Sequence, residues 1–578
     1  MLVLQNNLYL YMKLNKIIAF FFAISIFGSA FCQINNYKHY FVSPLQIEPS
    51  LSGNFGEPRT AHFHTGIDYR TYTEGKDVVC VADGYVSRIL VSPWGYGLAL
   101  YVNHPNNYTT VYAHLSRYNT EIEQFVEKVQ YEKQSFSIDT LLPDDLFVFK
   151  RGQTMAYSGN TGHSEGPHLH FEMRETDTEY PINVLESLYH VEDNITPEIN
   201  FLYVYPLSNI STVNGKQSKY KTKLKKNSDG VYMPPYDIKS ASTIGIGLAY
   251  VDRMNGTSNR YGAETVKLFV NNELIYHSVV DKLDFSKQTC KNSMFDYAEL
   301  LSDELHVHKL YIEPNNDLMI YPLSVNDGIF NVPLGKKSII KIEVSDYADN
   351  KSVVEFSISG VETDHDNVQE TESLTKWDKL SVLISEACRV EIDSAVLFKD
   401  EVVPFVKLRD GKYSSVYKLG EENIPLKKDF KISFFVDDKF LDYLDKIFVV
   451  REREGKARYI KPEVQQNNIS ASSSHFGQFY LWIDTIPPKI TPINVSKNKN
   501  MKNTSYIELK IEDNFSGIAN YNMYINGDWV LAKYEPRNSR IRYYFDSKMT
   551  IAEEYALKVV VKDNVNNTSV YETEFKRK

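Results

Sequence analysis

The stretch "GPHLHFEMR", residues 166–174, decides how the first part of this chain is interpreted. It places His168 and His170 one residue apart, between a Gly-Pro turn and a run that is typical of a β-strand. Residues i and i+2 of a strand point to the same side of a sheet, so both imidazoles can enter one site. An H-x-H pair alone is a weak signal, because 14 histidines are scattered along the chain and a surface pair is the ordinary alternative.

Two stretches upstream supply further side chains that could bind a metal. "HFHTGIDYR" contains His64 and Asp68 around Gly66, where a bend would let a ring nitrogen and a carboxylate oxygen converge, and "VYAHLS" contains His114. A catalytic zinc site uses three nitrogen or oxygen ligands and keeps one position open for water. Taken singly, His114 would be a core histidine and Asp68 a turn residue. Their joint occurrence with "HLH" predicts a metal site, with two groups left for acid–base chemistry.

The region around these residues has the texture of a β-domain. "GLALYVNH" and "TTVYAHL" predict two strands, and the Asp83–Gly84 step inside "DVVCVADGYVSRILV" predicts a hairpin. Residues 120–145 are charged and partly helical in pattern. They predict a surface insertion that borders the groove, where it could narrow the substrate range or act as a lid.

Across residues 40–190, with the match running from about 45, the chain resembles the lysostaphin-like (LytM-type) zinc endopeptidases, which cut peptide cross-links of bacterial peptidoglycan. The motifs occur in the family's order: "FGEPR", "HFHTGIDY", "GKDVVCVADGYVSRI", "GYGLALYVNH", "YAHLS", "RGQTMAYSGNTG" and "GPHLHFEMR". The resemblance implies a mostly antiparallel β-sheet with a groove and one zinc ion per chain. It assigns His64, Asp68 and His170 as zinc ligands. His168 and His114 match the two catalytic histidines.

The implied mechanism agrees with the chemistry of these residues. Zinc lowers the pKa of its bound water to about 7, so hydroxide is available at neutral pH. His168 would act as the general base and later deliver the proton to the leaving amine. Zinc and a protonated His114 would stabilise the oxyanion formed at the scissile carbonyl.

Beyond residue 190 the pattern becomes that of repeated β-modules. "SIIKIEVSDYADNKSVV" and "YIELKIEDNFSG" alternate apolar and polar residues as half-buried strands do. "DNITPEI" and "VSDYADNKSV" are echoed by "DTIPPKI" and "VKDNVNNTSV", which predicts two copies of one module. We therefore expect a mostly β protein in which about three sandwich modules follow the peptidase domain. They are an immunoglobulin-like sandwich at 191–361, a linker at 362–373, a β-rich module at 374–482 and an immunoglobulin-like sandwich at 483–578.

Residues 1–32 predict a secretory signal peptide, because Lys13 and Lys16 precede a short apolar run that ends in small residues. Met12 is an alternative start. The expected location is periplasmic, associated with the cell envelope, or extracellular. The formal charge of −10 argues against nucleic acid, which is usually bound by a basic surface. The expected partners are stem or cross-bridge peptides of peptidoglycan, with an envelope protein as a candidate partner of the C-terminal modules.

Three other functions compete with a peptidoglycan endopeptidase. The first is a non-catalytic member of the same fold that binds cell wall or activates another hydrolase. Such relatives typically lack metal ligands, and all five positions are present here. The second is an adhesion or scaffold protein that works through its sandwiches. The third is a zinc peptidase of the D-Ala-D-Ala type, which the "YAHLS" and "GPHLHFE" contexts disfavour.

Overall fold

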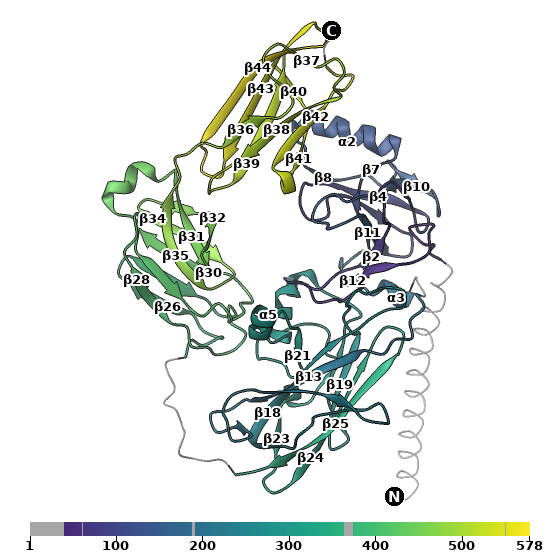
Figure 1. Cartoon of the computed structure of the whole chain (residues 1–578), viewed down its shortest axis with the longest axis vertical. Helices are drawn as coiled ribbons and strands as arrows, with labels where there is room; N and C mark the ends of the chain where they lie inside the picture. The colour runs from purple at the N-terminus through teal and green to yellow at the C-terminus, as the bar shows by residue number, and fades with distance from the viewer. Residues whose placement is uncertain (1–39, 61, 188–190, 363–373, 550, 578) are drawn as a thin grey trace, which may run out of the picture.

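The computed structural model describes residues 40–60, 62–187, 191–362, 374–549 and 551–577. The predicted signal peptide and nearly all of the predicted linker lie outside the described residues. Four β-rich units follow one another: the first unit (40–187), the second (191–362), the third (374–483) and the fourth (484–577). Figure 1 shows them arranged in a ring, in which the fourth unit returns to helix α2 of the first. The predicted mostly β class is confirmed. No helix within the described ranges is long and apolar enough to cross a membrane.

The first unit is built on one large antiparallel sheet. Its main strands, in spatial order, are β1 (Leu51–Gly53), β2 (Ile67–Arg70), β11 (His168–Glu175), β6 (Tyr108–Leu115), β5 (Leu98–Asn103), β4 (Gly84–Val91) and β8 (Ile138–Leu141). Short strands β12 (Pro181–Ile182) and β9 (Val148–Phe149) pair with β11 and β4. A second small sheet contains β3 (Asp77–Val79), β10 (Thr154–Tyr157) and β7 (Arg117–Tyr118). Helices α2 (Thr120–Lys133) and α3 (Val184–Ser187) complete the unit.

Strand β11 shows how the sequence pattern separates core from site. Leu169, Phe171 and Met173 alternate along it and join the core of the first unit, each at most 1% exposed. His168 and His170 occupy the intervening positions and therefore lie on the opposite face. The period of two thus buries one face in hydrophobic contacts and leaves the other for polar side chains.

The structure contradicts one local prediction about the first unit and adds detail to another. The Asp83–Gly84 step does not close a hairpin, because β3 pairs with β10 while β4 pairs with β5, β8 and β9. The prediction was wrong because the chain passes from the small sheet to the large one at this step. The predicted insertion at residues 120–145 begins with α2. Asn119, the residue just before it, caps this helix by accepting a hydrogen bond from the backbone N–H of Ile122. Strand β8 then pairs with β4, at the edge of the sheet remote from β2.

The second unit packs its strands around a core that includes Ile246, Leu268 and Ile342. The long strand β18 connects its two groups of strands by pairing with β13 along one half and with β25 at its start. Its strands are β13 (Glu198–Pro206), β14 (Thr212–Val213), β15 (Tyr220–Lys223), β16 (Lys225–Lys226), β17 (Tyr232–Met233), β18 (Ile238–Val251), β19 (Thr265–Val270), β20 (Glu273–Val279), β21 (Val307–Lys309), β22 (Leu323–Ser324), β23 (Phe330–Val332), β24 (Lys337–Ser345) and β25 (Lys351–Gly360). Its helices are η1 (Phe285–Cys290), α4 (Lys291–Met294), α5 (Tyr297–Asp303) and η2 (Asn326–Gly328).

The third unit contains two five-stranded sheets that share one core. One sheet holds β26 (Ser381–Ser385), β27 (Cys388–Ile392), β30 (Phe430–Phe435), β34 (Asn468–Ser473) and β33 (Glu463–Gln465). The other holds β28 (Phe405–Arg409), β29 (Val416–Leu419), β35 (Gly477–Ile483), β31 (Ile447–Arg453) and β32 (Lys456–Ile460), and helix η4 (Asp438–Tyr443) precedes β31.

The fourth unit likewise packs two sheets around one core. One sheet holds β36 (Lys489–Pro492), β38 (Tyr506–Glu512), β42 (Arg540–Tyr544) and β41 (Ala532–Glu535), and helix η5 (Pro536–Asn538) follows β41. The other holds β37 (Lys499–Asn500), β44 (Thr568–Lys576), β43 (Glu554–Asp563), β39 (Ile518–Ile525) and β40 (Asp528–Val530). The predicted inward faces of β24 and β38 are confirmed, because Ile340, Ile342, Val344, Ile507, Leu509 and Ile511 are all 0% exposed. The immunoglobulin-like relationship stays a prediction.

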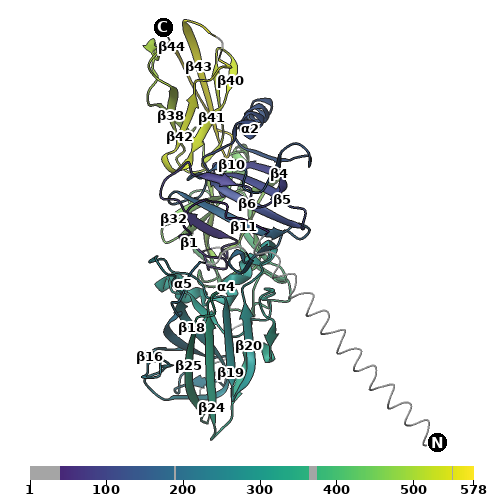
Figure 2. The same cartoon turned by 90° about the vertical axis from the view of Figure 1, so that its right-hand side faces the viewer.

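Contacts between the first and fourth units close the ring. Tyr131 of α2 donates its hydroxyl to Asp546 at 2.5 Å and lies edge-on against Trp529. Lys548 lies over the Tyr131 ring and pairs with Glu127 at 3.0 Å. Figure 2 shows the first unit between the fourth and the second units. Residues 120–145 therefore place a helix against the fourth unit.

Candidate metal centre

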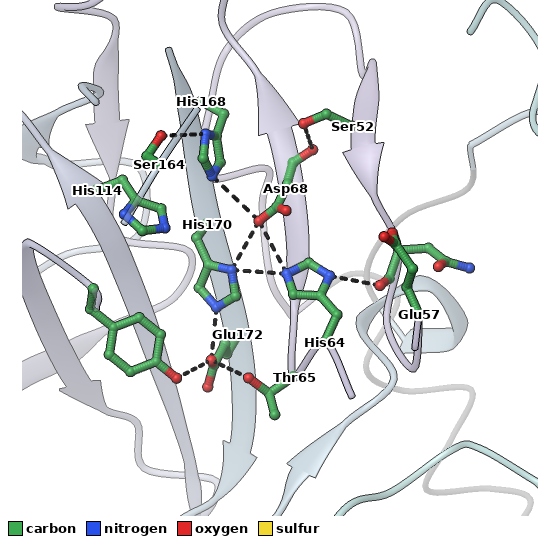
Figure 3. A network of polar contacts seen from close by, with 12 residues as sticks. Ser52, Glu57, His64, Thr65, Asp68, His114, Ser164, His168, His170 and Glu172 are labelled. Carbon is green, nitrogen blue, oxygen red and sulfur yellow. Dashed lines mark hydrogen bonds and ion pairs between the residues drawn. The ribbon is translucent and has the colours of Figure 1, made fainter. Parts of the chain in front are cut away.

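All five residues predicted for the site converge on one face of the large sheet (Figure 3). Asp68 lies on β2, His168 and His170 on β11, and His114 on β6, while His64 lies in the loop before β2. Strand register brings them together, because His170 is paired with Asp68 on one side and with Ala113, the neighbour of His114, on the other. Residues distant in sequence thus become adjacent.

Three of these side chains offer ligand atoms at the spacing that a small cation needs. Asp68 Oδ1 lies 2.9 Å from His170 Nδ1 and 3.1 Å from His64 Nε2, and the two nitrogens are 3.0 Å apart. Tetrahedral zinc with bonds of about 2.0–2.1 Å places its ligand atoms about 3.3 Å apart. The three side chains are between 2% and 5% exposed. This donor set of two imidazoles and one carboxylate therefore fits zinc in both chemistry and size.

The other polar atoms of the three ligands are held by neighbouring groups. His64 Nδ1 donates to the carbonyl oxygen of Asn54 at 2.7 Å, which leaves Nε2 to face the centre. Arg59 Nη2 donates to Asp68 Oδ2 at 2.6 Å, which leaves Oδ1 to face it. His170 Nε2 lies 2.7 Å from Glu172 Oε1, which leaves Nδ1. Such outer contacts fix the ligand's orientation and the ring nitrogen that it presents.

Glu172 is the functional residue that the sequence analysis did not identify. It is 0% exposed, and it accepts hydrogen bonds from Thr65 and Tyr96 at 2.6 Å each and from Arg174 at 2.7 Å. Burial alone would raise the pKa of Glu172, but Arg174 and His170 hold it far below its usual range. The signal was available, because Glu172 continues the alternation of His168 and His170 on the same face of β11.

His114 and His168 lie next to the three ligands, with their rings 4.7 Å apart. His114 Nδ1 donates to the carbonyl oxygen of Thr161 at 2.8 Å, and His168 Nδ1 donates to that of Gly166 at 2.8 Å. Each ring therefore has Nε2 available for a substrate, and His168 Nε2 lies 3.5 Å from Asp68 Oδ1. His114 has a φ of 59°, a left-handed conformation that costs a non-glycine residue about 1–2 kcal/mol.

Electrostatics at the centre differ from one group to the next: they favour neutral forms of His64 and His114, an ionised Asp68 and a protonated His170. Burial lowers the pKa of His64 to about 4, and burial together with His170 and His168 lowers that of His114 to about 3. Burial would raise the pKa of Asp68, but His64 and His170 hold it well below its usual range. Burial opposes charge on His170 as well, yet its hydrogen bonds to Asp68 and Glu172 raise its pKa to about 9. His114 is therefore neutral in the resting site; the protonated form expected during stabilisation of the oxyanion stays a prediction.

A cavity of about 710 Å³ lies between the first and fourth units, and its lining includes Thr161, whose carbonyl oxygen accepts a hydrogen bond from His114. Its lining includes residues of α2, Asn160–Gly162, Leu531 and residues 533–538. Arg537 donates to the carbonyl oxygen of Gly162 at 3.4 Å, next to the residue that holds His114. The fourth unit therefore contacts the loop that orients one of the site histidines.

A comparison with known protein families identifies the class of protein to which the first unit belongs. Residues 62–131 match Peptidase family M23, and this match includes His64, Asp68 and His114. The first unit therefore contains an M23 metallopeptidase domain of the lysostaphin-like (LytM) type, as the sequence predicted; from here on it is called the peptidase domain. Residues 372–484 match a Zu5-like domain, which coincides with the third unit.

Individual relatives match only part of this chain. A metalloprotease of Haemophilus influenzae is 32% identical over 135 residues, which make up 22% of this chain and 23% of that protein. The peptidoglycan DD-endopeptidase ShyC of Vibrio cholerae is 30% identical over 142 residues, 23% of this chain and 27% of that protein. The chain spans about a quarter of the length of these curated relatives. The catalytic domain of the antimicrobial peptidase lysostaphin from Staphylococcus simulans is 21% identical, covers 26% of this chain and 92% of that domain, and has a TM-score of 0.18.

Proposed function

We propose that this chain is an exported, zinc-dependent endopeptidase that hydrolyses peptide cross-links of bacterial peptidoglycan. The observation that carries the proposal is the triangle of His64 Nε2, Asp68 Oδ1 and His170 Nδ1, with separations of 2.9–3.1 Å, beside two further imidazoles. The relative named as a peptidoglycan DD-endopeptidase supports the substrate class. The apolar run near the N-terminus supports export.

The side chains have distinct roles in this proposal. Zinc bound by His64, Asp68 and His170 would supply a Lewis acid for the scissile carbonyl and for the attacking water. His168, whose Nδ1–H is held by the Gly166 carbonyl, accepts the proton of that water on Nε2 and returns it to the leaving amine. His114 lies against His168 and is neutral at rest. A further proton, taken up on Nε2 from solvent, would let it donate a hydrogen bond to the oxyanion.

Three variants of the full chain test this division of roles. His170→Ala should lose both zinc and hydrolysis, because a ligand is removed. His168→Ala should keep about one zinc per chain and lose turnover. General acid–base catalysis typically contributes about 10²–10⁴-fold to the rate. His163→Ala is the matched control, since this exposed histidine lies in the neighbouring loop and its backbone N–H bonds to Gly95.

Zinc content would be measured by atomic absorption, and hydrolysis by the release of dye-labelled fragments from purified sacculi. Mass spectrometry of the fragments identifies the bond that is cut. If the zinc-loaded wild type leaves sacculi of several cross-link chemistries intact, the endopeptidase proposal fails and a non-catalytic role is favoured. Equal zinc loss in His168→Ala and His170→Ala would contradict the assigned roles.

A further inference from the structure

Two clusters of three aspartates lie outside the peptidase site, each where the chain enters a β-unit. In each cluster the three side chains bring one carboxylate oxygen apiece within 4.8 Å of one another. The Asp252 cluster consists of Asp193, Asp252 and Asp346, and the Asp513 cluster consists of Asp484, Asp513 and Asp563. The first stands at the start of the second unit and the other at the start of the fourth.

The two clusters occupy equivalent positions in the two copies of the repeated module. Asp193 and Asp484 open the echoed stretches "DNITPEI" and "DTIPPKI" in the segments that enter each unit. Asp346 and Asp563 lie in the second echo, "VSDYADNKSV" and "VKDNVNNTSV". The middle members, Asp252 and Asp513, each follow directly after a strand, β18 and β38. The same arrangement thus occurs twice in one chain.

The hydrogen bonds around the clusters are the same as well. Asn350 Nδ2 donates to Asp346 Oδ2 at 2.8 Å and to the carbonyl oxygen of Asp193 at 3.1 Å. In the fourth unit, Asn567 Nδ2 donates to Asp563 Oδ2 at 2.7 Å and to the carbonyl oxygen of Asp484 at 3.0 Å. In each unit an asparagine therefore ties the entering segment to the third aspartate.

Both clusters contain buried carboxylate oxygens that the protein does not satisfy. Asp252 is 0% exposed, and neither of its carboxylate oxygens has a hydrogen-bond partner. The Oδ1 atom of Asp513 is also buried without a partner. Within the described part of the chain, none of the six aspartates forms an ion pair with a basic side chain. Buried like charges without a counter-ion are unfavourable, and a bound cation would balance them.

We propose that each of the two clusters binds one calcium ion. The donors are oxygens alone, which suits a hard cation and disfavours zinc. Magnesium usually keeps several waters and takes one or two carboxylates, whereas calcium accepts six to eight oxygens in flexible geometry. A site with three carboxylates, placed on loops and strand ends, matches the coordination of calcium better than that of magnesium. The proposal does not depend on the peptidase activity.

Bound calcium would fix the orientation of neighbouring units. Met254 and Tyr347, close in sequence to Asp252 and Asp346, pack against the core of the peptidase domain. Phe515 and Val565, close to the other cluster, pack with Phe448 of the third unit. The segments that would hold the ions are therefore the segments that contact the preceding unit. Calcium at both junctions would stiffen the ring in Figure 1 at two of its joints.

Calcium titration of the zinc-loaded full chain tests the proposal by isothermal titration calorimetry. The wild type should bind two calcium ions per chain. Asp252→Asn and Asp513→Asn should each bind one, and the double variant none. Asp229→Asn and Asp528→Asn, which change exposed aspartates in the same two units, should keep both ions.

Thermal unfolding separates ion binding from a structural defect. Calcium at about 5 mM exceeds the roughly 0.1–1 mM dissociation constants of extracellular modules, so it should raise the Tm of the wild type. Because Asp252→Asn relieves a buried charge, its Tm without calcium should equal or exceed that of the wild type, while the calcium-induced rise should shrink. Failure of the wild type to bind calcium at this concentration would overturn the proposal. Retention of two ions by both single variants would also overturn it. If Asp252→Asn fails to fold, the numbers of calcium ions bound by the wild type and by Asp513→Asn still test the proposal.

Discussion

Glu172→Gln is the substitution that most sharply tests how the peptidase domain holds its metal ligands. The change keeps the shape of the side chain but removes the charge that His170 Nε2 faces at 2.7 Å and that Arg174 pairs with at 2.6 Å. One amide position of glutamine is a donor, and it would face the donor groups of Arg174. The variant therefore weakens the support of a metal ligand without touching the ligand atoms themselves.

Two magnitudes follow from these contacts. Loss of an outer partner of a metal ligand typically lowers metal affinity about 10–100-fold, which corresponds to about 1.4–2.7 kcal/mol. Arg174 is 4% exposed, and a buried charge that loses its partner typically destabilises a fold by about 3–5 kcal/mol. Replacing Arg174 with methionine as well should restore much of the stability, because both charges are then gone, but it should not restore the zinc affinity.

Zinc affinity would be measured by competition with a fluorescent chelator, and stability by denaturant unfolding of the zinc-free protein. Glu175→Gln is the matched control on the same strand. Its half-exposed pair with Lys282 at 3.1 Å should contribute no more than about 1 kcal/mol and leave zinc binding unchanged. If Glu172→Gln folds and binds zinc as tightly as the wild type, Glu172 does not support the metal centre as described.

Three further predictions concern backbone packing, pH and the contact between units. Gly66→Ala should abolish zinc binding and cost about 1–3 kcal/mol of stability, measured by metal content and denaturant unfolding, because its Cβ would lie 2.3 Å from the carbonyl oxygen of Phe171. Burial would raise the pKa of Glu313, but Lys309 and its neighbours lower it to about 2 from 4.5. The stability from this carboxylate is fully present above pH 4.5 and is lost as the pH falls through about 2. Acid unfolding of the wild type should therefore be steeper over this window than that of Glu313→Gln, by up to about 3 kcal/mol. Tyr131→Ala should weaken the contact between α2 and the fourth unit by about 2–3 kcal/mol, seen as faster hydrogen exchange in α2 with zinc content unchanged.

Most of the site could be predicted because its signals are local. His168 and His170 share a strand face by period alone, and the motifs around His64 and Asp68 are short and ordered. The hydrogen bonds that hold these site residues in place could not be predicted in the same way. The pairing of Glu172 with Arg174 follows the strand alternation, but its bonds to Thr65 and Tyr96 depend on how distant segments pack.

The same limit applies to the fold. The prediction of a surface insertion at residues 120–145 did not include the edge strand Ile138–Leu141, because its partner β4 lies more than forty positions upstream. The Asp83–Gly84 step had the composition of a tight hairpin turn, but strand pairing placed its flanks in different sheets. The sequence echoes predict a repeated module, but they could not show that Asp193 and Asp346 lie close together, because that depends on the folded chain.

The central claim is that one zinc ion is bound by three named atoms of the peptidase domain. Anomalous X-ray scattering measured at the zinc edge on crystals of the zinc-loaded protein tests it most directly. A peak within about 2.0–2.2 Å of His64 Nε2, Asp68 Oδ1 and His170 Nδ1 is the predicted result. A peak bonded to His170 through Nε2, or located away from this triangle, would contradict the account.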